Sequence, residues 1–289
     1  MRSSFTRVTI LAGVSSLALV SAGMAQDAAP EAQSTENPVF VLGTIYLSAD
    51  DVDGYIASGA QVSKSVTPIA EQQQAVSVVT QQQMQDQGAQ NLGQALGYTA
   101  STLAEPFGSD PRFNEPFMRG FPSADAQYVN GLRQSRYFGA TSYELYGMQQ
   151  VEVLRGPSSG LYGAGQPMGV INQVQKRAQS EDFAEAGLGY DSNSSPQAFF
   201  DVNRAVSDDL SFRLTGIGRD QKNQIEDITN ESCYLAGAAR WTPDAMTTID
   251  FLASYRKDKP VTPTGVPYAL TQIADGDDLR DLYTGQDNW

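Results

Sequence analysis

The sequence contains no histidine and a single cysteine, Cys233. Without histidine the chain lacks the base of Ser-His-Asp and Cys-His hydrolases and the commonest metal ligand. One cysteine cannot form an internal disulfide.

Positive charge is also scarce: the sequence has 19 Lys and Arg and 33 Asp and Glu, so the net charge is −14. This disfavours nucleic acid as a partner, since its binders neutralise phosphates with Lys and Arg. The charge is compatible with an exported or cell-surface protein.

A catalytic pair of carboxylates is missing as well. Acidic residues adjoin at Asp50 and Asp51, at Asp208 and Asp209, and at Asp277 and Asp278. Neighbours in polar connections do not converge on a substrate as a general acid and base must. We therefore expect no enzyme, no bound cofactor and no metal site.

The first 25 residues have the pattern of a secretory signal peptide. Arg2 and Arg7 supply its positive start, and residues 8–20 form an apolar run too short to span a bilayer as a helix. A small-x-small cleavage site ends at Ala25. The alternative is an N-terminal membrane anchor. The polar residues 26–38 that follow have no apolar period, which predicts disorder.

Glycines concentrate in residues 151–177, VEVLRGPSSGLYGAGQPMGVINQVQKR. Two β-prone runs flank Gly160, Gly163, Gly165 and Gly169, which predicts strands around a turn where backbones approach closely. A phosphate-binding loop is the enzymatic alternative. No Lys follows these glycines in the required way, and their spacing misses the dinucleotide fingerprint by one residue. A tight turn in some β domain is the remaining alternative.

Local signals predict a small mixed fold before this stretch. Residues 75–80 read as a strand, and Thr80 with Gln83 forms a capping box for a short helix that Gly88 ends. A second short helix is expected around residues 91–97. Residues 117–121 read as a strand, and residues 128–132 as strands with an Asn-Gly turn.

After Glu181 apolar and polar residues alternate. The alternation predicts five strands near residues 183–190, 197–206, 210–221, 232–241 and 247–257. Leu214 is apolar between Arg213 and Thr215, for example. Segments of about ten residues with this period are typical of transmembrane β-barrels. A soluble antiparallel sandwich also alternates and is the alternative.

The quoted glycine-rich segment resembles the signature of the plug domain of TonB-dependent outer-membrane receptors of the siderophore type. VSVVTQQQMQDQGAQNLGQAL resembles the start of that plug, and MRGF, YVNGL and LRGP follow in its order. The resemblance covers residues 60–178. It implies an α+β plug domain, a small mixed sheet with short helices, followed by the first antiparallel strands of a transmembrane β-barrel of about 22 strands. Five strands leave open edges, so we expect the chain to be truncated.

The resemblance also implies a domain plan: signal peptide 1–25, flexible segment 26–60, plug 61–178 and barrel start 181–289. Near the mature N-terminus a β-prone run resembles the TonB box, which adds a strand to the coupling protein. Its residues are Gly43, Thr44, Ile45, Tyr46, Leu47, Ser48 and Ala49.

The implied function is active uptake of a ferric siderophore across the bacterial outer membrane, with TonB and its inner-membrane energising complex as partners. A monomeric barrel in outer-membrane lipid is expected, without nucleic acid. The family's ligand-facing loops map to Arg112, Ser123, Gln127, Arg133, Arg136, Tyr137 and Phe138. Aromatic surface and positive charge there suit an anionic chelate. For each aromatic residue, plain core packing is the alternative.

In this family, arginines of two Arg-Gly motifs are held inside the barrel by wall glutamates. Arg119 and Arg155 match those positions and are the expected plug–barrel latch, although both could be ordinary arginines beside turns. Two other functions stay open. One is a receptor of the same fold for haem, cobalamin or an oligosaccharide. The other is a truncated remnant or a plug-only binding module that transports nothing.

Overall fold

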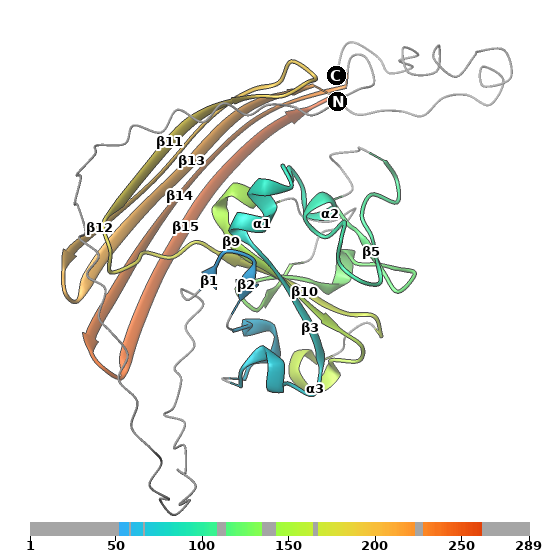
Figure 1. Cartoon of the computed structure of the whole chain (residues 1–289), viewed down its shortest axis with the longest axis horizontal. Helices are drawn as coiled ribbons and strands as arrows, with labels where there is room; N and C mark the ends of the chain where they lie inside the picture. Colours follow the sequence, from blue (N-terminus) through green and yellow to red (C-terminus); the bar gives the residue numbers. More distant parts are fainter. Residues whose placement is uncertain are drawn as a thin grey trace, which may run out of the picture. The chain divides into compact units, whose positions relative to one another are not determined.

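The computed structural model describes residues 52–57, 59–65, 67–108, 114–134, 143–163, 167–222 and 228–261. The predicted signal peptide and the TonB-box run lie outside these residues. Two five-stranded sheets dominate the described part: a mixed sheet of order β3-β9-β10-β7-β8 and an antiparallel sheet of order β11-β12-β13-β14-β15 (Figure 1). A three-stranded sheet, β4-β5-β6, and the hairpin β1-β2 complete the strands.

The elements before the long strands are short. The strands are β1 (Val52–Asp53), β2 (Ile56–Ala57), β3 (Ala75–Thr80), β4 (Thr102–Leu103), β5 (Phe117–Met118), β6 (Phe121–Pro122), β7 (Gln127–Val129), β8 (Leu132–Arg133), β9 (Met148–Arg155) and β10 (Gly169–Gln175). The α-helices are α1 (Gln81–Asp86), α2 (Leu92–Ala95) and α3 (Ser159–Tyr162). The 3-10 turns are η1 (Gln61–Ser63), η2 (Ile69–Glu71), η3 (Ala124–Ala126) and η4 (Leu145–Gly147). No helix within the described ranges has the length and apolar character needed to cross a membrane.

The mixed sheet is built around β9. This strand pairs antiparallel with β3 and with β10, and β10 pairs parallel with β7. Its two faces bury separate apolar clusters. Val151, Val153 and Ile171 belong to one, with Leu92 and Leu96 of the α2 region. The other contains Val62, Tyr128, Leu154 and Val170. The predicted α+β fold of a small mixed sheet with short helices is therefore confirmed.

The glycine-rich turn between β9 and β10 contains α3. At Gly169 φ is +121°, and a Cβ built there would lie 1.9 Å from the carbonyl oxygen of Leu154 on the paired strand. Only glycine fits this backbone approach, which the sequence pattern predicted.

The local signals for α1 are confirmed. The hydroxyl of Thr80 accepts a hydrogen bond from the backbone N–H of Gln83, at 3.2 Å, so Thr80 is the N-cap. Gly88 has φ +65°, the left-handed conformation that follows many helix ends.

The prediction of one strand over residues 117–121 is wrong. A turn at Arg119 and Gly120, with φ +51° and +85°, divides it into β5 and β6. Two successive positive φ values match the twist of a two-residue hairpin. The neighbouring prediction is confirmed, since Asn130 and Gly131 also have positive φ and join β7 to β8.

All five predicted long strands are present, as β11 (Phe183–Tyr190), β12 (Pro196–Ser207), β13 (Leu210–Lys222), β14 (Thr229–Asp244) and β15 (Thr247–Pro260). β14 is longer at both ends than predicted, because ladder pairing with β13 and β15 continues through polar residues that resemble loop sequence.

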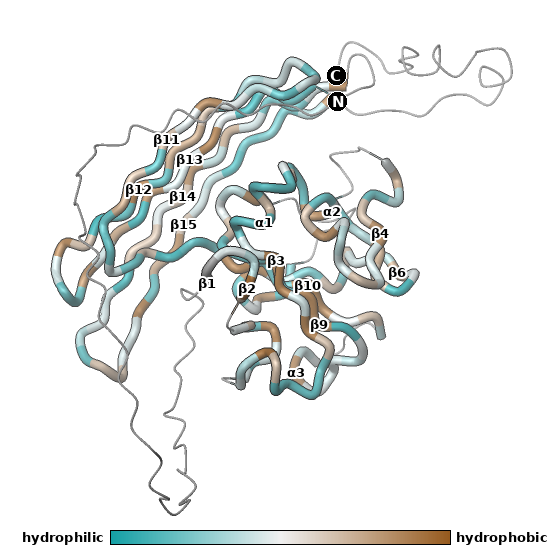
Figure 2. The backbone as a smooth tube through the Cα atoms, viewed as in Figure 1, coloured by the Kyte–Doolittle hydropathy of each residue, from teal (hydrophilic) through white to brown (hydrophobic). Residues whose placement is uncertain are grey.

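The alternation of apolar and polar residues along the long strands places the two kinds of side chain on opposite faces of the sheet. Leu214 is 48% exposed, whereas its neighbours Arg213 and Thr215 are 6% and 2% exposed. Phe251 on β15 is 69% exposed. Figure 2 shows apolar patches recurring along these strands between polar ones. One face is thus apolar and open, and the other is polar and covered, as a membrane-facing wall requires.

Candidate functional site

Three of the predicted ligand-binding residues lie in the described part of the chain. Ser123 and Gln127 are buried, and the amide nitrogen of Gln127 donates to the carbonyl oxygen of Asn114 at 2.9 Å. Arg133 is exposed, and its Nε donates to the carbonyl oxygen of Asp125 at 3.1 Å. In this structure the buried side chains of Ser123 and Gln127 therefore stabilise the chain between β6 and β7 and do not face solvent. Arg112, Arg136, Tyr137 and Phe138 lie outside the described residues, and the ligand role of the set stays a prediction.

The two predicted latch arginines lie near each other in the mixed-sheet part. Arg155 donates from Nη1 to the hydroxyl of Ser77 at 2.7 Å. Arg119 is exposed, and its Nη1 lies 3.7 Å from the position a Cβ would take at Gly156. Within the described ranges neither makes an ion pair with the long strands. Their latch role stays a prediction.

Other residues make the contact between the two sheets. Lys176 directly follows β10, and its Nζ lies 2.7 Å from Oδ2 of Asp201 on β12. Arg213 on β13 donates to both oxygens of the same carboxylate, each at 2.8 Å, and the Thr215 hydroxyl donates to Oδ1 at 3.0 Å. We call Lys176, Asp201, Arg213 and Thr215 the wall cluster. The side chains of its three charged residues are at most 5% exposed.

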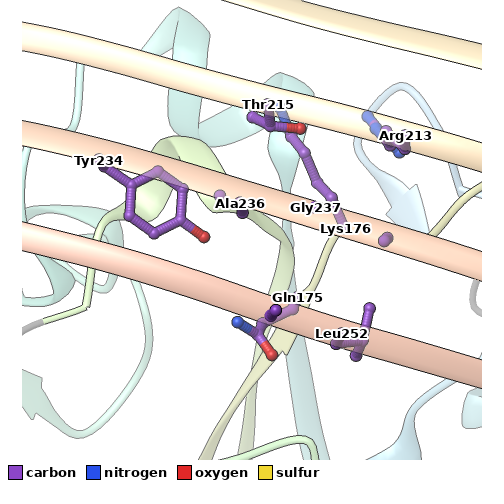
Figure 3. Close-up of a pocket in the computed structure, with 11 residues that line it drawn as sticks. Gln175, Lys176, Arg213, Thr215, Tyr234, Ala236, Gly237 and Leu252 are labelled. Carbon is purple, nitrogen blue, oxygen red and sulfur yellow. The ribbon is translucent and has the colours of Figure 1, made fainter.

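The wall cluster adjoins a small cavity. Figure 3 shows Gln175 and Lys176 beside residues of β13, β14 and β15. The Nζ of Lys176 also lies 4.0 Å from the ring centroid of Tyr146, within range of a cation–π contact. Burial lowers the pKa of Lys176 to about 8, although the adjacent Asp201 carboxylate favours the charged form. Lys176 is therefore mostly protonated at neutral pH, at a desolvation cost that Asp201 and Tyr146 offset in part.

A second ion pair joins η4 to β13. Nη1 of Arg219 lies 2.6 Å from Oε1 of Glu144, and the Glu144 side chain is 2% exposed. The same oxygen accepts a hydrogen bond from the backbone N–H of Tyr146 at 3.1 Å, so the carboxylate also begins the 3-10 turn. Close to it, a Cβ on Gly147 would lie 2.1 Å from the hydroxyl oxygen of Tyr234. This part of the mixed-sheet domain is therefore matched in shape and charge to the strands beside it.

None of these contact residues belongs to the site residues predicted from the sequence. The alternation of apolar and polar residues along β12 and β13 could have indicated three of them, because Asp201, Arg213 and Thr215 all lie on the polar face of their strands. Their partner Lys176 lies at the end of the signature segment, beside Arg177, and this pair of basic residues gives no sign of burial. Charged side chains buried between two elements are costly unless paired, so this geometry identifies the contact as a specific one.

The described domain matches a known family model. Residues 68–170 match the TonB-dependent Receptor Plug Domain. The chain belongs to the TonB-dependent receptors. The ferrioxamine receptor of Yersinia enterocolitica is 32% identical over 71% of this chain and 30% of that protein. The ferrichrome outer membrane transporter/phage receptor of Escherichia coli is 32% identical over 69% of the chain and 27% of that protein. The chain groups with siderophore receptors and spans about a third of the length of these relatives.

Solved structures of this receptor type have the same fold. The ferric-catecholate import receptor Fiu of E. coli superposes with a TM-score of 0.69 at 23% identity, over 80% of this chain and 36% of that one. The siderophore receptor PiuA of Acinetobacter baumannii gives a TM-score of 0.64 at 26% identity, over 74% and 31%. The mixed-sheet part is thus the plug, the long strands are wall strands, and the receptor is an outer-membrane protein. Its relatives are receptors and transporters, not enzymes.

Proposed function

We propose that the protein takes up a ferric siderophore across the outer membrane with energy supplied through TonB. The observation that supports this most is the plug itself, joined by buried ion pairs to strands whose other face is apolar. The domain plan proposed with it is a signal peptide 1–25, a flexible segment 26–60, a plug 61–178 and a barrel beginning at residue 181.

In this proposal the siderophore binds from outside, at loops of the plug apex and on the barrel wall. Binding makes the TonB box at residues 43–49 available in the periplasm. TonB, energised by the proton gradient of the inner membrane, pulls on this segment and rearranges the plug. No covalent chemistry is needed, so the protein works as a transporter and the ferric siderophore is cargo.

Uptake is tested with radioactive iron in cells that lack other siderophore receptors. The relatives suggest ferrioxamine B, ferrichrome and a ferric catecholate as a first panel. We expect one of them to be accumulated, and Ile45→Pro to reduce accumulation at least about tenfold. Proline removes the backbone N–H and fixes φ, so the segment can no longer pair as an added strand.

Ala29→Pro is the matched control, since it lies in the same segment before the predicted box. It should leave uptake unchanged. Siderophore binding to whole cells should be equal in all three proteins, because the box does not touch the ligand. Equal uptake by the Ile45→Pro protein would contradict the box assignment, and no uptake from a wider siderophore panel would contradict the function.

The ligand residues are tested by affinity. Arg112→Ala and Tyr137→Ala are each expected to weaken siderophore binding about tenfold, since a charge-assisted hydrogen bond contributes about 1.5–3 kcal/mol. Binding is measured by fluorescence titration of the purified protein. Arg204→Ala, which removes an exposed charge on β12, is the control and should bind normally. An unchanged affinity would remove Arg112 and Tyr137 from the site.

A further inference from the structure

Glu152 is a buried carboxylate that no cation neutralises in the described part of the chain. It lies on β9, between β3 and β10 in the mixed sheet, and is fully buried. Its two oxygens accept four hydrogen bonds. Gln150 Nε2 donates at 2.6 Å and Asn172 Nδ2 at 2.9 Å, both from the sheet itself. The other two donors come from a distant segment of the chain.

Those two donors are consecutive backbone N–H groups. Gln61 donates to Oε1 at 2.8 Å and Val62 to Oε2 at 2.7 Å. One carboxylate thus holds the start of η1 with both of its oxygens. Hydrogen bonds to a charged acceptor are the stronger kind, and here they lie in an apolar environment.

The same short segment, up to Lys64, makes further contacts with the plug. The Val62 side chain packs in the cluster of Leu154 and Val170. The Tyr162 hydroxyl donates to the Val62 carbonyl oxygen at 2.8 Å, and Lys64 Nζ donates to the Leu161 carbonyl oxygen at 2.6 Å. All of these contacts are to the plug sheet and α3. Across the described ranges, residues 52–64 make no hydrogen bond or ion pair with the long strands.

The rest of the plug is attached differently. Glu144, which precedes β9, pairs with Arg219, and Lys176, which follows β10, pairs with Asp201. Both ion pairs lie at the same end of the β9–β10 pair, the end away from the glycine-rich turn. A pull on the chain before residue 52 therefore meets the contacts of Glu152 before it meets any wall contact in the described residues. If the segment leaves, Glu152 loses two donors at once while still enclosed, so partial release is unfavourable.

We propose that Glu152 is a positioning residue that clasps residues 61–62, and that this segment is released as one unit while the wall-anchored strands stay in place. The proposal rests on the proposed function for the direction of the pull. Its physical basis, one carboxylate shared between the segment and the sheet, does not depend on which siderophore is carried.

Cysteine accessibility tests the clasp in the full receptor purified from outer membranes. With Cys233→Ser as the parent, Ser63→Cys places a first reporter thiol in η1, where Ser63 is 7% exposed. Ala178→Cys places a second reporter thiol at a fully buried site, two residues after Lys176 of the wall cluster. Maleimide labelling rates are then measured without siderophore and without TonB, so failure of the proposed function cannot change the result.

Two variants weaken the clasp from opposite sides. Glu152→Gln keeps the shape but removes the charge. Gln61→Pro leaves Glu152 intact and removes one donor. Proline is tolerated at the first position of a helical turn, and Ala60 before it is already extended, with φ −137° and ψ 126°. Both variants are expected to raise the labelling rate of the first reporter, in η1, about tenfold or more and to leave that of the second reporter unchanged.

Unchanged labelling of the η1 reporter in both variants would overturn the clasp. Faster labelling of both reporters would also overturn it, because the plug would then loosen as a whole rather than release one segment. If the Glu152→Gln protein is not recovered from the membrane, Gln61→Pro decides the question alone, since it alters no buried side chain of the sheet.

Discussion

Asp201→Ala is expected to lower the free energy of unfolding by about 3–5 kcal/mol, the cost of leaving buried charges without their partner. Asp201 is the only carboxylate in the wall cluster, and it binds both Lys176 and Arg213. Without the Asp201 carboxylate, Lys176 can lose its proton, because burial already lowers its pKa to about 8. Arg213 cannot, so it carries most of the penalty.

Two comparison variants isolate this effect. Lys176→Met should cost less than about 1.5 kcal/mol, because Asp201 keeps both bonds from Arg213 and the methionine fills similar space. Asp250→Ala removes an aspartate on β15 that pairs with Arg177 and Arg240 and is 21% exposed. It should cost about 1 kcal/mol or less, since water screens it.

Thermal unfolding of the purified proteins in detergent measures all three variants. The expected order of destabilisation is Asp201→Ala, well ahead of Lys176→Met and Asp250→Ala. The wall cluster would not be the main polar attachment of the plug if Asp201→Ala and Asp250→Ala lowered the unfolding temperature equally.

Gly169→Ala is expected to destabilise the plug by about 3–5 kcal/mol, through backbone strain together with a forced separation of strands. The added Cβ would lie 1.9 Å from the carbonyl oxygen and 3.0 Å from the carbonyl carbon of Leu154. Both atoms are backbone atoms of β9 at the turn end of the β9–β10 pair, so no side chain can move aside. The register that brings Ile171 opposite Val153 would have to shift locally.

Gly156→Ala is the matched control. Gly156 also has a positive φ, +95°, but the nearest atom to its Cβ position is Nη1 of Arg119, at 3.7 Å. Only the strain of the dihedral remains, which costs about 1–3 kcal/mol. Limited proteolysis of the receptors in outer membranes reports plug opening. Slower or equal digestion of the Gly169→Ala plug relative to Gly156→Ala would contradict the close approach.

Much of the fold follows from short-range rules. Thr80 and Gln83 mark the start of α1 because a hydroxyl three residues before a backbone N–H satisfies that donor. The alternation along β13 separates Leu214 from Thr215 because successive side chains of a strand point to opposite faces. Both signals lie within a few residues, so no distant contact is needed to interpret them.

At the turn that contains Arg119, these short-range rules gave the wrong prediction. The dipeptide Asn130-Gly131 predicts a hairpin because both residues tolerate positive φ. Arg119 and Gly120 have the same conformation, but arginine rarely adopts positive φ, so the pattern resembled a continuous strand. Pairing of β5 with β4 and β6 supports the conformation that local preference disfavours.

The amino-acid sequence by itself determined the family, the order of plug and wall strands, the two strand faces and the glycines of the signature. The tertiary structure alone decided which charges meet: Lys176 with Asp201, Glu144 with Arg219, and Glu152 with the backbone of residues 61–62. Strand periodicity and caps arise from neighbours in sequence. A buried ion pair depends on the register of strands far apart in the chain, where a shift of one residue would reverse every side chain.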